Sequence, residues 1–100
     1  MTRVSDVVAP SHPALAGHFP GDPVVPGVLL VARVVRAAEG LAGAPLEAIP
    51  VAKFHAPLYP GVRFEIELER TSDATMAFRV LRDDALIASG KLRFRGRDAA

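Results

Sequence analysis

The chain has 100 residues, of which half are hydrophobic and 23% are charged, a balance typical of a folded domain and not of a disordered one. It has no cysteine, which excludes disulfides, thiolate catalysis and cysteine-ligated metals, and its net charge of +1 gives no case for nucleic-acid binding. No uncharged apolar run reaches the roughly 18 to 20 residues that span a bilayer, and no secretion signal is evident. We therefore expect one domain over residues 1–100, in the cytoplasm and not in a membrane.

The first half of the chain predicts a strand, a long loop and a helix. Val4–Val8 is a short, partly apolar segment that fits a first strand. Residues 9–27 are so rich in proline and glycine that we expect no regular structure there. A loop of this length is uncommon in a small domain unless it carries function.

The run Val28–Leu41 lies between a Pro-Gly start and a glycine-containing end, which favours a helix. Only Arg33, Arg36 and Glu39 form a polar stripe on its otherwise apolar surface. Because a helix that is apolar almost all round is normally a buried one, we expect this helix to lie at the centre of the fold.

The second half of the chain predicts an antiparallel meander. Polar turns separate four predicted strands, which are Leu46–Ala56, Val62–Arg70, Thr75–Leu81 and Ala85–Arg95. Apolar and charged residues alternate most clearly in the second of these, as in a half-buried strand. The whole pattern indicates an α+β fold, in which an antiparallel sheet of about five or six strands wraps around one central helix.

Two segments carry a family resemblance. Residues 17–28 read Gly-His-Phe-Pro-Gly-Asp-Pro-Val-Val-Pro-Gly-Val, and residues 53–61 read Lys-Phe-His-Ala-Pro-Leu-Tyr-Pro-Gly. Both segments, and the order of elements from about Pro10 to Phe94, resemble the 3-hydroxyacyl-carrier-protein dehydratases of fatty acid biosynthesis and their polyene-pathway relatives. The resemblance implies a hot-dog fold and a lyase that acts without a cofactor. Its substrate would be a 3-hydroxyacyl thioester, linked to acyl carrier protein or CoA, and its product the trans-2-enoyl thioester.

This reaction explains the residue types in the loop. A histidine suits removal of the weakly acidic α-proton because its pKa lies near working pH. Helix-terminal N–H groups suit the negative charge that then develops on the thioester oxygen. The resemblance implies that His18 is the base, that the N–H of Gly27 polarises the carbonyl and that the carbonyl of Val24 orients the imidazole. It also implies substrate contacts from Phe19, Gly21, Val24 and Pro26. The alternative is that His18 is an ordinary histidine in a stiff connection.

One position departs from the family pattern. The family's second catalytic group is a helix acid that protonates the departing hydroxyl, and alignment on His18 places it at Ala32. Asp22 and Glu39 are the candidate substitutes, although Glu39 lies about 10 Å further along the helix at 1.5 Å per residue.

The family builds its site at a subunit interface, where the histidine of one chain meets the acid of the other. The protein is then either a dehydratase without its usual acid or a non-catalytic or half-catalytic acyl-binding subunit. In the second case it pairs with an acid-bearing hot-dog partner. We expect either a homodimer or a heterodimer with a related hot-dog subunit. A thioesterase or an enoyl-thioester hydratase is a third reading. Pro13 stands where the related hydratases place an acid, which argues against the hydratase version.

The remaining candidates are weaker. His12 and the loop histidine have neither metal-ligand spacing nor accompanying carboxylates, so we expect no metal site. His55 stands where relatives often carry arginine and is expected at a surface or rim, and Tyr59 is expected to be structural. In the last strand, Lys91, Arg93 and Arg95 share one face and Arg97 continues the series. They either protect a strand edge from aggregation or dock an acidic carrier protein.

Overall fold

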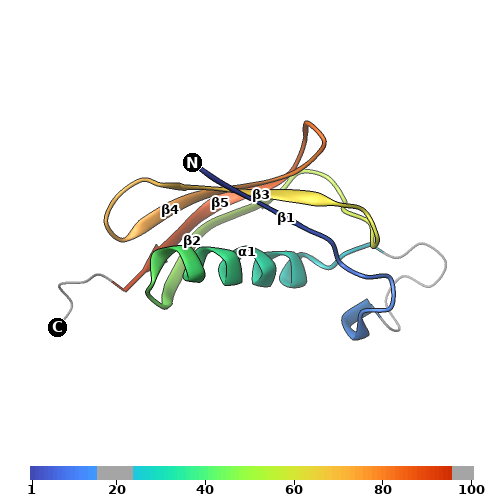
Figure 1. Cartoon of the computed structure of the whole chain (residues 1–100), viewed down its shortest axis with the longest axis horizontal. Helices are drawn as coiled ribbons and strands as arrows, with labels where there is room; N and C mark the ends of the chain where they lie inside the picture. Colours follow the sequence, from blue (N-terminus) through green and yellow to red (C-terminus); the bar gives the residue numbers. More distant parts are fainter. Residues whose placement is uncertain (16–23, 96–100) are drawn as a thin grey trace.

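The structure is a computed structural model that describes residues 1–15 and 24–95. One α-helix, one short 3-10 helix and five strands follow one another along the chain (Figure 1). Their order and bounds are β1 Thr2–Asp6, η1 Pro13–Leu15, α1 Gly27–Ala42, β2 Leu46–Phe54, β3 Phe64–Arg70, β4 Thr75–Arg82 and β5 Ala85–Phe94. The first strand lies nearer the N-terminus than predicted, and the other elements match their predicted ranges closely.

All five strands form one antiparallel sheet in the order β1-β3-β4-β5-β2. The meander from β3 to β5 occupies the middle of the sheet, and β1 and β2 are its edges. Helix α1 lies along one face, beneath the sheet in Figure 1. The predicted α+β class is confirmed, with five strands.

The core lies between this helix and the sheet. Residues Phe64, Ile66 and Leu68 of β3 are each 1% exposed, which confirms the alternation read from the sequence. Buried apolar residues of β4 and β5 extend the same core layer. Leu30, Val34 and Ala38 of α1 pack against this layer from the other side. Burial of each large apolar side chain contributes about 1.5–3 kcal/mol, so this layer holds the helix against the sheet.

The opposite face of α1 is not buried by the described chain. Residues Val28, Ala32, Arg36 and Gly40 form an exposed stripe at four-residue spacing, and Val28 is 81% exposed. The prediction of a helix buried almost all round is therefore wrong for the chain alone. A single sheet covers only one side of a helix, so the apolar residues on the other side are not covered by residues 1–15 and 24–95.

Short structures shape the loops on either side of the helix. Residues 13–15 form the 3-10 turn η1, so the expectation of no regular structure from 9 to 27 is wrong at this point. Helix α1 is capped by Gly43, whose φ of 66° suits glycine and whose N–H donates to the carbonyl of Glu39 at 3.0 Å. The Tyr59–Val62 turn has Pro60 and then Gly61 at φ 80°, the order that a type II turn favours.

Ion pairs tie the edge strand β1 to its neighbours. The guanidinium of Arg33 on α1 donates to both carboxylate oxygens of Asp6, at 2.9 and 3.0 Å. On the other face of the sheet, Glu67 is only 5% exposed because Arg3 and Arg79 cover its carboxylate from both sides. The hydrogen bond and charge of Glu67, with the charge of Glu65, raise the pKa of Arg3 above its ordinary value. Arg3 therefore keeps its charge at any pH at which the protein is handled.

Candidate active site

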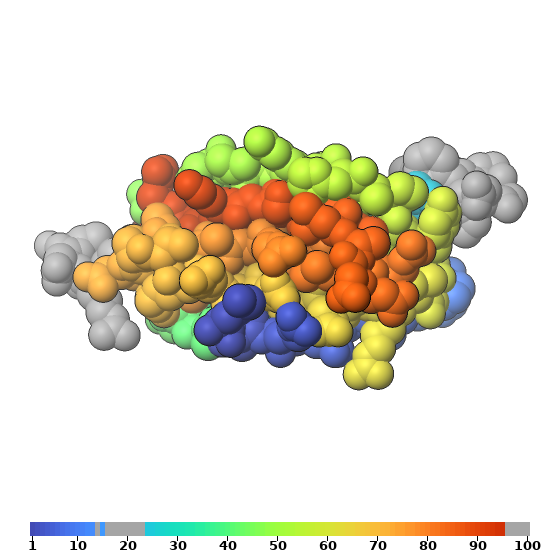
Figure 2. Space-filling model, turned by 90° about the horizontal axis from the view of Figure 1, so that it is seen from above, coloured from blue at the N-terminus to red at the C-terminus, as the bar shows by residue number. Residues whose placement is uncertain are grey.

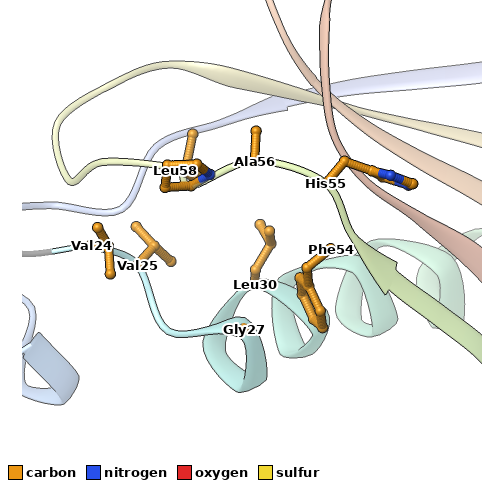
Figure 3. A pocket seen from close by; sticks show the side chains of 9 residues that line it. Val24, Val25, Gly27, Leu30, Phe54, His55, Ala56 and Leu58 are labelled. Carbon is orange, nitrogen blue, oxygen red and sulfur yellow. The ribbon is translucent and has the colours of Figure 1, made fainter.

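A cleft of about 420 Å³ lies where the start of α1 faces the chain segment that follows β2 (Figure 3). The N–H of Val25 donates to the carbonyl of Leu58 at 2.7 Å and joins the two walls. The lining is mostly aliphatic and consists of Val24, Val25, Gly27, Leu30, Phe54, His55, Ala56, Pro57 and Leu58. The cleft therefore suits an apolar chain that reaches the helix N-terminus.

The start of the helix leaves donors unused. Pro26 is the N-cap residue and provides no side-chain cap, while its carbonyl accepts from the N–H groups of Leu29 and Leu30. Among the described residues, none accepts a hydrogen bond from the N–H of Gly27 or Val28. These amides lie at the positive end of the helix dipole, beside the cleft, and can donate to a polarised oxygen.

Phe54 forms the wall of the cleft next to this helix start. A Cβ atom built on Gly27 would lie 2.9 Å from Cζ of the Phe54 ring, so only glycine fits under the ring as it stands. The ring is otherwise accessible, since Phe54 is 54% exposed. A larger residue at position 27 would therefore have to displace this exposed ring, a packing constraint that adds to the close substrate approach expected from the sequence.

His55 lines the cleft but does not aim its imidazole into it. Figure 3 shows the side chain pointing away from Leu30 and Val25, towards β5. Its Nε2 lies 2.9 Å from Oγ of Ser89, and its N–H donates to the carbonyl of Ile87 at 2.8 Å. The structure thus places His55 at the rim, where the sequence led us to expect it.

Ala32 lies on the exposed stripe of α1 and is not a lining residue of the cleft. No carboxylate lines the cleft among the described residues. Glu39, one candidate substitute, instead accepts a hydrogen bond from the N–H of Leu46 at 2.8 Å and anchors the start of β2. The structure thus gives Glu39 a structural contact away from the cleft.

Of the site residues predicted in the loop, the structure describes those from Val24 onwards. Val24 and Gly27 line the cleft, and Pro26 caps the helix between them. His18, Phe19, Gly21 and Asp22 lie outside the described residues. Their predicted roles remain predictions.

The opposite wall was not assigned to the site from the sequence. Phe54, Ala56, Pro57 and Leu58 were noticed only as part of a strand-and-turn segment. The signal was available, because Lys53–Gly61 is the second of the two segments that carry the family resemblance. What the sequence lacked was the fold that brings this segment opposite the helix start.

Within residues 1–15 and 24–95, no three His, Asp or Glu side chains gather closely enough to hold a metal ion. In the same part of the chain, no helix has the length and apolar character needed to cross a bilayer.

Comparison with known sequences finds dehydratases. A family model described as ApeI-like, ApeI dehydratase, matches residues 2–91. A 3-hydroxyacyl-[acyl-carrier-protein] dehydratase of Anaeromyxobacter sp. (strain K) is 36% identical over 76 residues, covering 64% of this chain and 49% of the relative. The corresponding enzyme of Bordetella pertussis is 36% identical over 104 residues, covering 85% of this chain and 69% of the relative. The chain therefore spans about half the length of the first relative.

Comparison with solved structures finds the same fold. The dehydratase heterocomplex ApeI:P from Xenorhabdus doucetiae matches with a TM-score of 0.79 at 28% identity, covering 93% of this chain and 86% of that chain. A fluoroacetyl-CoA-specific thioesterase matches with a TM-score of 0.65 at 20% identity, covering 92% and 85%. The second likeness concerns the fold alone. The five-stranded sheet with one helix is thus a hot-dog fold, as the resemblance implied.

Proposed function

The chain belongs to the ApeI-like dehydratase family, and from this premise we propose that it removes water from a 3-hydroxyacyl thioester, with His18 as base. The observation that carries this proposal is the helix start, where N–H groups with no acceptor among the described residues lie beside a mostly aliphatic cleft. A thioester needs both features, because its acyl chain is apolar and its carbonyl oxygen becomes negatively charged during the reaction.

The steps follow from this arrangement. The acyl chain lies against Val25, Leu30 and Leu58, and the thioester oxygen accepts from the N–H of Gly27. His18 removes the α-proton, and the electron pair forms the double bond of the enolate, whose oxygen the helix N-terminus stabilises. The electrons then return to form the trans-2,3 double bond as the hydroxyl leaves. The hydroxyl must take a proton to depart as water, and Ala32 cannot provide one.

In a second candidate function, another subunit provides the missing proton donor. The chain would provide the base half of a site that an acid-bearing hot-dog partner completes. Two observations support it: Ala32 lies on the exposed stripe of α1, and the structurally similar ApeI:P dehydratase is a heterocomplex. A carboxylate from a partner that covers this stripe would approach the cleft from outside the chain. The two candidates share the base chemistry and differ in the source of the acid.

The experiment is a dehydration assay with a 3-hydroxyacyl thioester on acyl carrier protein, using the chain alone and with a co-expressed acid-bearing hot-dog subunit. Formation of the 2-enoyl thioester is followed by mass spectrometry. His18→Ala should remove activity in both arms. Activity of the chain alone at a normal rate would rule out the need for a partner, and activity that survives His18→Ala would overturn the base assignment.

The thioesterase reading has less support. Water attack on the thioester needs a carboxylate or other base near the carbonyl, and no acid lines the cleft among the described residues. The likeness to a thioesterase structure is at 20% identity and concerns the fold. Release of free acid in the same assay would count in favour of that reading.

A further inference from the structure

The basic residues of β5 do not protect a sheet edge. Strand β5 lies inside the sheet, paired with β4 on one side and β2 on the other. A strand with two neighbours has no free N–H and C=O row for a foreign strand to join, so edge protection does not explain its cations. The exposed cations of β5 therefore need another explanation.

These cations lie on the face of the sheet that points away from α1. Lys91 and Arg93 alternate with the buried Leu92 and Phe94, which face the core. Figure 2 shows this outer face, with β5 in red-orange between β4 and the yellow-green β2. Lys53 of β2 lies on the same side, because it pairs in register with Ser89. We call the four residues Lys53, Lys91, Arg93 and Arg95 the basic face.

The basic face carries charges that the described chain does not neutralise. In register, Lys91 has Ala77 and Val51 beside it, and Arg93 has Thr75 and Ala48. Among the described residues, no carboxylate lies within ion-pair distance of the four cations, and all four are exposed.

Most of the acids on this side of the sheet are already paired. Strand β3 presents Glu65, Glu67 and Glu69. Glu65 and Glu67 form ion pairs with Arg3, and Glu67 also pairs with Arg79 of β4, whereas Glu69 has no ion pair among the described residues and lies two strands away from Lys91. The outer face thus divides into a half over β1, β3 and β4, where Arg3 and Arg79 are paired with carboxylates, and a basic half over β5 and β2, where the cations are not. Such an arrangement attracts an anionic partner to one half only.

The basic face also adjoins the cleft. Lys53 directly precedes Phe54, and because successive residues of a strand point to opposite faces, one faces outwards and the other faces Gly27. Val51, the register partner of Lys91, lies about 10 Å from Phe54 along β2, at about 3.3 Å per residue. His55 links the two regions, since it lines the cleft and contacts Ser89 on β5. A molecule held on the basic face is therefore close to the cleft rim.

We propose that the basic face docks the acidic protein that carries the thioester, so that its acyl group reaches the cleft around the Phe54 end of β2. This inference rests on the proposed function for the identity of the carrier. Exposed charges of this kind act by steering and orientation, so docking is weak and salt-dependent. The acyl group itself is recognised in the cleft.

The test is the charge-reversed variant Lys91→Glu/Arg93→Glu, compared with Arg63→Glu/Arg70→Glu. The second pair removes the same charge from exposed positions off the basic face. Circular dichroism and thermal melting check that both variants fold. We expect the first variant to raise KM about tenfold for carrier-linked substrate and to leave KM for a short thioester mimic unchanged. The control variant should match the parent for both substrates. Equal effects of the first variant on both substrates, or equal effects of the two variants, would overturn the proposal.

A binding measurement separates this proposal from the proposed function. Titration of acyl carrier protein is followed by calorimetry at low and moderate salt, and it needs no turnover. Binding that weakens with salt and is lost in Lys91→Glu/Arg93→Glu supports docking even if no dehydration is seen. Absence of carrier binding in the parent protein overturns docking whether or not the enzyme acts on a short thioester. Tighter binding of a single-stranded oligonucleotide than of the carrier would also overturn it.

Discussion

The ring of Phe54, at the end of β2, lies directly on Gly27, the first residue of α1. This contact joins an edge strand to the helix terminus, whose first N–H groups have no acceptor among the described residues. It also makes the aromatic ring part of the cleft wall beside the helix start. The helix terminus and the ring therefore form one structural unit, which substitutions on either side can test.

Gly27→Ala should disturb this unit because the new methyl carbon would lie 2.9 Å from Cζ of Phe54. We expect a loss of about 1–3 kcal/mol in the free energy of unfolding, typical of overpacking, and at least a tenfold loss of dehydration rate. Urea denaturation and the dehydration assay measure the two effects. The double variant Gly27→Ala/Phe54→Leu should recover stability, since the shorter leucine side chain leaves room for the new methyl group. Failure to recover would place the cause elsewhere than in this contact.

Ala32→Glu or Ala32→Asp should restore the missing proton donor if the chain works as a homomeric dehydratase. A general acid contributes about 10² to 10⁴ in rate, so the gain in the assay should fall in that range. Arg36→Glu places an acid one turn along the same exposed stripe and is the matched control, expected to give no gain. If Ala32→Glu changes nothing while an acid-bearing partner raises the rate, the heteromeric candidate is favoured.

Asp6→Asn should loosen the edge strand β1 from the helix. Arg33 donates to both oxygens of Asp6, and both side chains are largely shielded, at 22% and 29% exposure. Removal of the negative charge leaves the guanidinium without its partner, at an expected loss of about 1–2 kcal/mol in unfolding free energy. Glu47→Gln, at an exposed position of β2, is the control and should change stability by less than about 0.5 kcal/mol. Urea titration at neutral pH compares the two variants, and equal stabilities would contradict the assigned role of the ion pair.

Gly90→Ala should displace the edge strand β2. A Cβ at residue 90 would lie 2.1 Å from the carbonyl oxygen of Val51 and 2.6 Å from Cε2 of Phe78, so backbone must move. We expect a loss of at least about 2 kcal/mol in unfolding free energy, as for severe overpacking. Gly40→Ala adds the same methyl group where nothing lies within 4 Å, and should stabilise the helix by about 0.5–1 kcal/mol. Thermal melting distinguishes the two, and a shift of the same sign in both would contradict the packing argument.

The sequence predicted most of the fold because local patterns decide local structure. Alternation in β3 placed Phe64, Ile66 and Leu68 in the core, and they are buried. The turn residues separated the strands correctly, and Pro26 and Gly43 flank the helix. Burial of the whole helix surface failed as a prediction, because hydrophobicity identifies faces that avoid water but not the molecule that covers them.

The site was only half predictable. Val24 and Gly27 were expected at the cleft, whereas the facing wall of Phe54, Pro57 and Leu58 was not. The structural role of Glu39 was also missed, since its hydrogen bond to the start of β2 depends on how the chain returns after the helix. Contacts between elements distant in sequence follow from topology, which periodicity does not specify.

By itself, the sequence determined the residue types on which the proposed chemistry rests: a loop histidine, a Pro-Gly helix start and an alanine where the resemblance implies an acid. The identity of the residue at each position does not depend on how the chain packs. Only the tertiary structure decided that Phe54 covers Gly27, that Ala32 lies on an exposed stripe and that β5 is an interior strand. The reason is physical, because strand order and helix rotation result from the burial of the whole apolar surface at once, and no single segment contains that information.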